Sequence, residues 1–149
     1  MQTSVGLFMA LVLLFSGISF VYGEAGVSDP TDPVGSWRVV SFLNLTGALV
    51  APIAGSEITA TFGPDWKLSG NDGCASYSAE YTIGSGAMLI SPATQMSRAC
   101  CEELTAQEQN FFADLKGVAR AEKNETTLKL FDDDDQLLIE LTRRQGGEE

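Results

Sequence analysis

The sequence predicts an α+β fold, in which a curved antiparallel β-sheet of about six to eight short strands packs around one α-helix. Three observations support this prediction. Several short segments alternate apolar and polar residues with a period of two, which is typical of half-buried strands. Tight turns rather than helical connections join most of these segments, which favours antiparallel pairing. One later segment has helical spacing, and a single helix can cover a sheet of this width only if the sheet curves around it.

The predicted strands are rich in β-branched and aromatic residues or alternate regularly, and turn-forming residues separate them. In chain order they are 37–42, 57–62, 66–70, 77–83 and 87–90, with 126–131 and 136–142 after the helix. The aspartate run 132–135 joins the last two segments, and we expect it to form a hairpin loop.

The helix is predicted over residues 102–115. Its apolar residues fall on one side and should pack beneath the sheet: Leu104, Phe111, Phe112 and Leu115. Lys116 and Gly117 are typical of a helix C-terminus, with Gly117 as the capping residue. Glu102 and Glu103 could form an acid/base pair only if they were buried. At the start of a helix they are more simply explained as partners of the helix dipole.

The first 23 residues are predicted to be a secretory signal. Residues 5–21 form an almost unbroken apolar run, and Val21 and Gly23 suit cleavage after Gly23. No Lys or Arg precedes the run, which is nearly long enough to span a bilayer, so an uncleaved N-terminal anchor is the alternative. In both cases the remainder lies outside the cytoplasm, secreted or in the cell envelope, and the chain contacts the membrane only if residues 5–21 are retained as an anchor.

The remaining sequence divides into a polar linker at 24–33, a domain at 34–143 and a charged tail at 144–149. The full length of 149 residues suits one domain, which we expect to be a monomer. A formal net charge of -11 disfavours nucleic acid as a partner. The chain has no histidine, the commonest general base and metal ligand. We therefore predict no catalytic residues, no metal site and no cofactor.

Three cysteines in an exported domain predict one disulfide and one remaining thiol. Cys74 is expected to pair with Cys100 or Cys101. The alternative is a Cys100–Cys101 disulfide acting as a redox switch, which requires a strained small ring. Zinc is disfavoured because there is no histidine and no pair of cysteines with two residues between them.

The run Asp132 to Asp135 has neither the glycine nor the bidentate glutamate of a calcium loop, and consecutive residues of a hairpin should point to opposite sides. It is therefore predicted to be a solvated loop, with weak binding of a divalent cation as the alternative.

Two tripeptides are sequons for N-glycosylation, and both fall at turn-like positions. They are Asn44-Leu45-Thr46 and Asn124-Glu125-Thr126. Four aromatic residues at strand spacing should belong to the core, with a ligand groove as the alternative: Trp37, Trp66, Tyr77 and Tyr81.

Residues 69–81 (SGNDGCASYSAEY) are similar to the glycine-cysteine strand motif of the META/HslJ-like family. Four further matches follow the family pattern in order: Gly35-Ser36-Trp37, Ile90-Ser91-Pro92, Ala99-Cys100, and Glu108 with Phe111-Phe112. The closing hairpin, with Leu128, Leu130, Leu137 and Leu138, also fits, and the resemblance covers roughly residues 34–143. Two positions depart from the pattern: Ala75 stands where the family has asparagine, and Met96 stands where it has threonine when Cys100 is aligned with the family cysteine. There is also no cysteine before Cys74 that could carry a lipid.

The resemblance implies a curved antiparallel sheet against a helix, in secreted or cell-envelope proteins linked to heat-shock response, antibiotic tolerance and protozoan motility. It implies that Cys100 is the partner of Cys74 and that Cys101 is free, because Ala99-Cys100 matches the family better. We expect a non-enzymatic stress-related or binding module whose ligand, a protein or a small molecule, is not identified. The alternative is an extracellular carboxylate-dependent hydrolase, which requires two acidic residues in one concave pocket and at least one shifted pKa.

Overall fold

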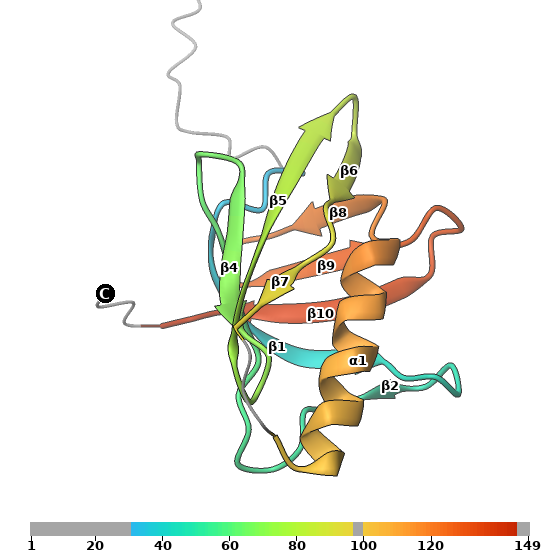
Figure 1. Ribbon diagram of the computed structural model, residues 1–149. Helices are drawn as coiled ribbons and strands as arrows, with labels where there is room; N and C mark the ends of the chain where they lie inside the picture. Colours follow the sequence, from blue (N-terminus) through green and yellow to red (C-terminus); the bar gives the residue numbers. More distant parts are fainter. Residues whose placement is uncertain (1–30, 97–99, 146–149) are drawn as a thin grey trace, which may run out of the picture.

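The computed structural model describes residues 31–96 and 100–145. Within these ranges the chain forms one ten-stranded antiparallel sheet and one α-helix, which confirms the predicted α+β fold (Figure 1). The predicted signal at residues 1–23 lies outside the described residues, as do 24–30 of the predicted linker. No helix in the described ranges combines the length and the apolar character needed to cross a membrane.

Seven strands precede the helix: β1 (Gly35–Leu43), β2 (Leu49–Val50), β3 (Thr59–Phe62), β4 (Lys67–Asn71), β5 (Ser76–Gly84), β6 (Ala87–Ile90) and β7 (Thr94–Gln95). The helix is α1 (Glu102–Gly117), and three strands follow it: β8 (Arg120–Lys123), β9 (Thr127–Phe131) and β10 (Leu137–Arg143). Each predicted strand segment corresponds to one of these strands. Three strands were not predicted from the sequence. Strands β2 and β7 are too short to show alternation, and in β8 charged residues surround the one buried side chain, Ala121.

The strand order is β6-β5-β4-β3-β1-β10-β9-β8, with β2 beside β1 and β7 beside β5. The central strand β1 is bulged where its register with β10 shifts between Val39 and Ser41, and bulges increase twist and bending. The sheet curves until its two ends meet, and the Met88 amide of β6 donates a 2.7 Å hydrogen bond to the Ala119 carbonyl beside β8. The result is a nearly closed barrel.

The helix α1 lies on the concave side of the sheet and contacts β1, β6 and β10 (Figure 1). Phe111 and Leu115 are buried as predicted, whereas Phe112 is only partly buried and packs against the edge of the core. The prediction that Gly117 caps the helix is wrong, because Gly117 is the last helical residue and Val118 is the cap, with an extended backbone (φ −63°, ψ 128°). Val118 is itself buried, so the chain leaves the helix directly into β8 without a left-handed turn.

The core fills the space between the helix and the concave face of the sheet. Its largest fully buried side chains include Trp37, Phe62, Phe111, Leu68 and Ile139. The Trp37 indole donates a 2.7 Å hydrogen bond to the carbonyl of Pro33, which is also buried. The end of the predicted linker therefore packs against the domain.

Strands β3 and β4 approach closely at Gly70. A Cβ atom there would overlap the Thr59 carbonyl oxygen and would lie 2.9 Å from the Tyr77 hydroxyl. That hydroxyl donates a 2.7 Å hydrogen bond to the same Thr59 carbonyl, so the space is already filled. Position 70 therefore requires glycine, because there is no room for a side chain.

Candidate functional site

A disulfide joins Cys74, just before β5, to Cys100, just before α1. The two Cα atoms are 6.1 Å apart, and 26 positions separate the residues in the sequence. Cys101 is a free, exposed cysteine at the N-cap of α1. The structure therefore contains the Cys74–Cys100 pairing that the family resemblance implies.

The turn before Cys74 is built around Asp72, whose side chain is fully buried. One carboxylate oxygen accepts hydrogen bonds from the backbone amides of Cys74 (2.9 Å) and Ala75 (2.8 Å). The other accepts a 2.8 Å bond from the Gln95 side chain. Because both oxygens are engaged, Asp72 has a structural role in presenting Cys74 to the helix.

A second buried polar residue, Gln107, fixes a loop to the helix. Its side-chain oxygen accepts the Ile53 amide hydrogen at 2.7 Å, and its nitrogen donates to the Ser56 hydroxyl at 3.1 Å. The same nitrogen would lie 2.6 Å from a Cβ atom at Gly73, whose φ is +99°. The helix N-terminal half, the loop before β3 and the turn before β5 therefore pack as one unit.

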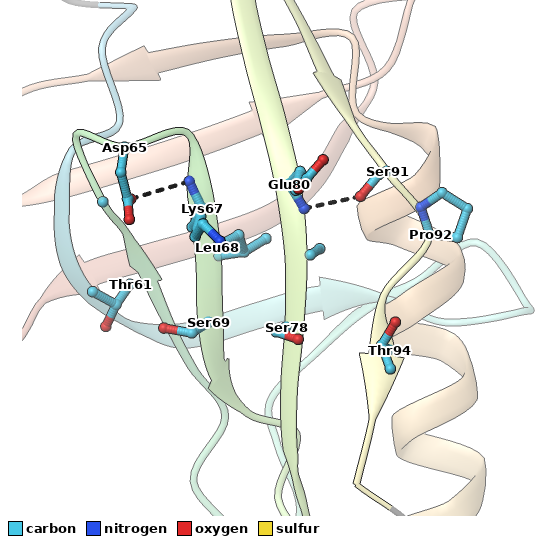
Figure 2. Close-up of a pocket in the computed structure, with 12 residues that line it drawn as sticks. Thr61, Asp65, Lys67, Leu68, Ser69, Ser78, Glu80, Ser91, Pro92 and Thr94 are labelled. Carbon is cyan, nitrogen blue, oxygen red and sulfur yellow. Dashed lines mark hydrogen bonds between the residues drawn. The ribbon is translucent and has the colours of Figure 1, made fainter.

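An open groove of about 480 Å³ crosses the outer face of β3, β4 and β5 (Figure 2). A row of hydroxyl groups crosses five neighbouring strands on this face, and all of its members except Ser36 line the groove: Ser36, Thr61, Ser69, Ser78 and Thr94. Pairing in register places each member directly opposite the next. Directly opposed residues of paired strands present their side chains on one face, so the hydroxyls form a continuous row. We call these five residues the hydroxyl row.

Three charged residues line one end of this groove. Lys67 of β4 lies opposite Glu80 of β5, and Asp65 accepts the Lys67 amide hydrogen at 3.3 Å. The Ser91 hydroxyl accepts the Glu80 amide hydrogen at 2.9 Å (Figure 2). Two carboxylates therefore flank one ammonium group, an arrangement that does not favour an anionic ligand.

The predicted aromatic residues divide between the core and the surface. Trp37, Tyr77 and Tyr81 are buried, and Tyr77 packs edge-on against Phe111 with ring centroids 5.6 Å apart. Trp66 is 52 % exposed, in the turn between β3 and β4. Trp37, Tyr77 and Tyr81 are therefore core residues, as predicted. Of the four aromatic residues, only Trp66 has a ring exposed enough to contact a ligand directly.

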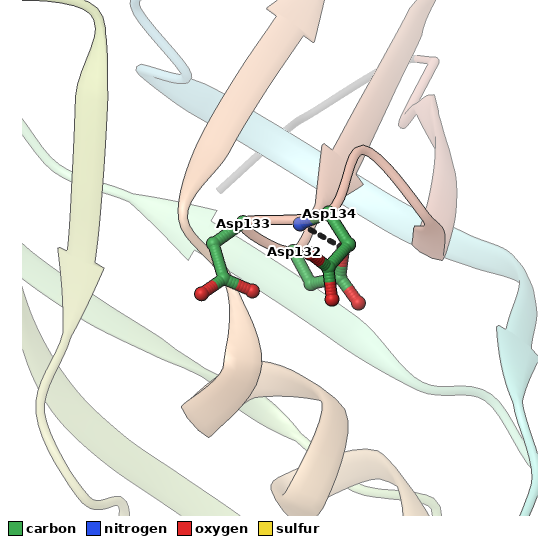
Figure 3. A group of neighbouring side chains, drawn as sticks. All are labelled: Asp132, Asp133 and Asp134. Atoms are coloured by element: carbon green, nitrogen blue, oxygen red, sulfur yellow. Dashed lines mark hydrogen bonds between the residues drawn. The ribbon is translucent and has the colours of Figure 1, made fainter.

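The aspartate run forms the β9–β10 hairpin loop, as predicted. Asp132 curls the loop, because its side chain accepts the backbone amide hydrogens of Asp134 (2.9 Å) and Gln136 (2.8 Å). Carboxylate oxygens of Asp132, Asp133 and Asp134 consequently lie within 4.8 Å of one another, closer than the expected alternation would place them (Figure 3). The cluster is mostly exposed, and Asp132 already uses one oxygen within the loop.

Both sequons lie at hairpin turns, where the asparagine side-chain oxygen accepts backbone amide hydrogens. Asn44 accepts those of Thr46 and Ala48, at 3.0 Å each. Asn124 accepts those of Thr126 (3.0 Å) and Thr127 (2.8 Å). Asn124 is exposed and Asn44 is half-buried, and glycosylation at either residue stays a prediction.

Asp114 of α1 carries a buried carboxyl group that was not predicted from the sequence, and the residue is 7 % exposed. Its Oδ2 has no hydrogen-bond partner among the residues that the structure describes. Burial raises the pKa of Asp114 to about 7, although a hydrogen bond from the Leu43 amide acts in the opposite direction. The signal was available, since Asp114 adjoins Leu115 and falls three positions after Phe111 on the apolar side of the helix.

We expect the stability of the protein to fall as pH rises through the range set by Asp114. Its folded pKa of about 7 lies above the ordinary value of 3.8, so its favourable contribution is complete below pH 3.8 and is lost as pH rises through 7. Allowing for partial solvent screening, we expect a loss of about 2 kcal/mol that Asp114→Asn does not show. Urea unfolding at several pH values measures this, with Asp133→Asn as an exposed control. Parallel curves for wild type and Asp114→Asn would contradict the assignment.

Glu102 and Glu103 are exposed in the first turn of α1, consistent with a favourable interaction with the helix dipole. Neither lines the groove. The hydroxyl row was also missed, because single serine and threonine residues on exposed strand faces become a row only when the strand register is known.

Comparison with known proteins places this fold in a family. The META domain model matches residues 32–145. Similar solved structures include an NMR structure of a protein from Burkholderia xenovorans, with 21 % identity, a TM-score of 0.63, and coverage of 78 % of this chain and 91 % of that one. A crystal structure of a DUF4847 family protein from Bacteroides vulgatus has 14 % identity and a TM-score of 0.55, and covers 74 % of this chain and 92 % of that one.

At these identities, the likeness to the two solved structures shows the fold alone. The search among curated proteins found no significant match. The family model, in contrast, spans most of the chain, including both disulfide cysteines, the hydroxyl row and the helix. The chain therefore belongs to the META domain family.

Proposed function

We propose that the domain is an exported, non-catalytic binding module whose groove holds an uncharged carbohydrate chain along the hydroxyl row. The observation that carries this proposal is the alignment of hydroxyl groups across β1, β3, β4, β5 and β7. Ser69, Ser78 and Thr94 are exposed, so their hydroxyls are open to a ligand.

The chemistry of the row favours a ligand that is itself rich in hydroxyl groups. Each serine or threonine hydroxyl both donates and accepts hydrogen bonds, as does each hydroxyl of a sugar. Paired strands are about 4.8 Å apart, so an elongated ligand can contact several members of the row in succession. An anionic chain is disfavoured by Asp65 and Glu80 beside Lys67 and by the overall charge of -11.

Export is supported by the disulfide between Cys74 and Cys100 and by the apolar segment at residues 5–21. Disulfides persist in oxidising compartments and are rare where glutathione and thioredoxin keep thiols reduced. We propose secretion, or residence in the cell envelope, on this basis. A stress-related role rests only on the resemblance to the family.

The hydrolase alternative meets one of its two requirements. Asp65 and Glu80 line the same groove, as a pair of catalytic carboxylates would. However, the acid whose pKa is raised, Asp114, is buried on α1 and does not line this groove. Binding without catalysis therefore accounts better for the groove.

Titration of the purified protein with soluble oligosaccharides tests the proposal. Cellotetraose, maltotetraose and chitotetraose are suitable probes, followed by isothermal calorimetry and by backbone amide shifts in NMR spectra. For the probe that binds, Ser69→Ala/Ser78→Ala should weaken affinity by about tenfold, because two hydrogen bonds of about 1 kcal/mol each are largely lost.

Ser76→Ala is the matched control, since Ser76 is exposed on β5 but does not line the groove. It should bind like the wild type. Shifts confined to residues away from the groove would contradict this site. New reducing ends during incubation, abolished by Glu80→Gln, would instead support the hydrolase.

A further inference from the structure

The turn between β3 and β4 holds a tryptophan in an unusual conformation. Trp66 has a φ of +66°, a left-handed backbone that bulky side chains rarely adopt. Its side chain is 52 % exposed, so core packing does not account for the choice of residue. Strained, exposed residues of this kind occur preferentially at ligand-binding sites.

Trp66 forms one wall of a pocket at the end of the barrel. We call this the end pocket; it has a volume of about 390 Å³ and is lined by Asp32, Val34, Pro64, Trp66, Tyr81 and Ile83. The rings of Trp66 and Tyr81 are 5.7 Å apart and inclined at 59°. Tyr81 is held in place, because its hydroxyl donates a 2.5 Å hydrogen bond to the Gly63 carbonyl and its ring packs edge-on against Phe62.

The charges around the end pocket are negative. Asp32 lines it directly, and the residues lining it include no Lys or Arg. Burial raises the pKa of the Tyr81 hydroxyl, and the carboxylates of Asp32 and Asp65 raise it further, which is the direction expected for negative charge near this hydroxyl. Asp32 accepts the Val34 amide hydrogen through one oxygen, at 3.0 Å, which orients the carboxylate.

An exposed tryptophan ring, with the buried Tyr81 ring behind it and the Asp32 carboxylate in the same pocket, is complementary to one class of ligand. The faces of tryptophan and tyrosine attract cations through their quadrupoles, and a methylated ammonium group also gains from apolar contact. An anion would be repelled, and a neutral apolar molecule would gain nothing from the carboxylates. We propose that the end pocket binds a small organic cation that carries a quaternary or alkylated ammonium group.

This site is separate from the hydroxyl row, because Trp66 and Tyr81 do not line the groove. Its volume falls in the range of small-molecule sites, roughly 300–1,000 Å³. A free small cation is therefore the proposed ligand, rather than the lysine side chain of a protein partner.

Choline is a suitable probe, and dimethylbutanol is its uncharged analogue of the same shape. Tryptophan fluorescence reports the binding, since Trp66 is exposed while Trp37 is buried. At constant ionic strength, choline should change the emission in a saturable manner and dimethylbutanol should not. Equal responses to both compounds, or none to choline, would overturn the proposal.

Variants then locate the site by calorimetry. Asp32→Asn keeps a side-chain acceptor for the Val34 amide but removes the charge, and it should weaken choline binding by about fivefold. Trp66→Gly suits the positive φ while removing the ring, and it should weaken binding by about tenfold, with partial recovery in Trp66→Tyr.

Asp133→Asn removes the same charge from the distant hairpin loop and should bind like the wild type. If it weakens binding as much as Asp32→Asn does, the effect is general charge attraction and the site is refuted. A peptide containing trimethyllysine should not bind more tightly than choline. If it binds at least about tenfold more tightly, the ligand is a methylated lysine of a protein partner and the small-molecule proposal is overturned.

Discussion

Replacing Gly70 with alanine is expected to destabilise the protein by more than about 3 kcal/mol. The added methyl group would overlap the Thr59 carbonyl oxygen of β3 and crowd the Tyr77 hydroxyl. Neither neighbour can move cheaply, because the Thr59 carbonyl belongs to the backbone of a paired strand and is the acceptor for that hydroxyl. The alanine variant must therefore separate β3 from β4 or lose the Tyr77 hydrogen bond.

Gly84→Ala is the matched control, since Gly84 ends β5 and a Cβ atom there would meet nothing within 4 Å. Urea unfolding of both variants measures the difference. Similar unfolding midpoints for Gly70→Ala and Gly84→Ala would show that the close approach of β3 and β4 is not required for stability.

Removing the disulfide with Cys100→Ser should cost about 3 kcal/mol, because the bond closes a loop of 26 positions in the unfolded chain. The Cys101→Ser variant should be nearly as stable as the wild type, since Cys101 is exposed and unbonded. The double variant Cys100→Ser/Cys101→Ser cannot form a substitute bond between Cys74 and Cys101, so it measures the loss of the native disulfide alone.

Peptide mapping of non-reduced, exported protein provides the direct measurement. It should yield Cys74 linked to Cys100 and one thiol, on Cys101, that reacts with iodoacetamide. The same digest should begin at Glu24 if the predicted signal is removed. Three reactive thiols in freshly exported protein would contradict the disulfide, and retention of Met1 in a membrane fraction would support the anchor instead.

The elements with strong local signals could be predicted from the sequence. Alternation identified strands such as β3 and β5, and apolar spacing identified the side of α1 that carries Phe111 and Leu115. The disulfide partner of Cys74 had no such local signal. Cys100 and Cys101 are adjacent, so an argument from sequence spacing does not distinguish between them. Only the family resemblance distinguished them.

The candidate sites depend on information that no local pattern contains. The hydroxyl row requires the register of four strand pairs, and the end pocket requires the chain before β1 to meet the β3–β4 turn. The positive φ of Trp66 also could not be predicted from the sequence, because turns usually place glycine or asparagine in that conformation. Buried Asp114 was overlooked for another reason, since charged residues on a helix are normally assigned to its solvent side.

The pairing of β1 with β10 has a consequence for the order of folding. These two strands lie side by side at the centre of the sheet, yet Trp37 pairs with Arg143 from the opposite end of the domain. Closing so long a loop is slow, and the central pair cannot form until residue 143 has left the ribosome. During synthesis the chain therefore remains without the β1–β10 pair, and the two parts of the sheet on either side of it join only after β10 is complete.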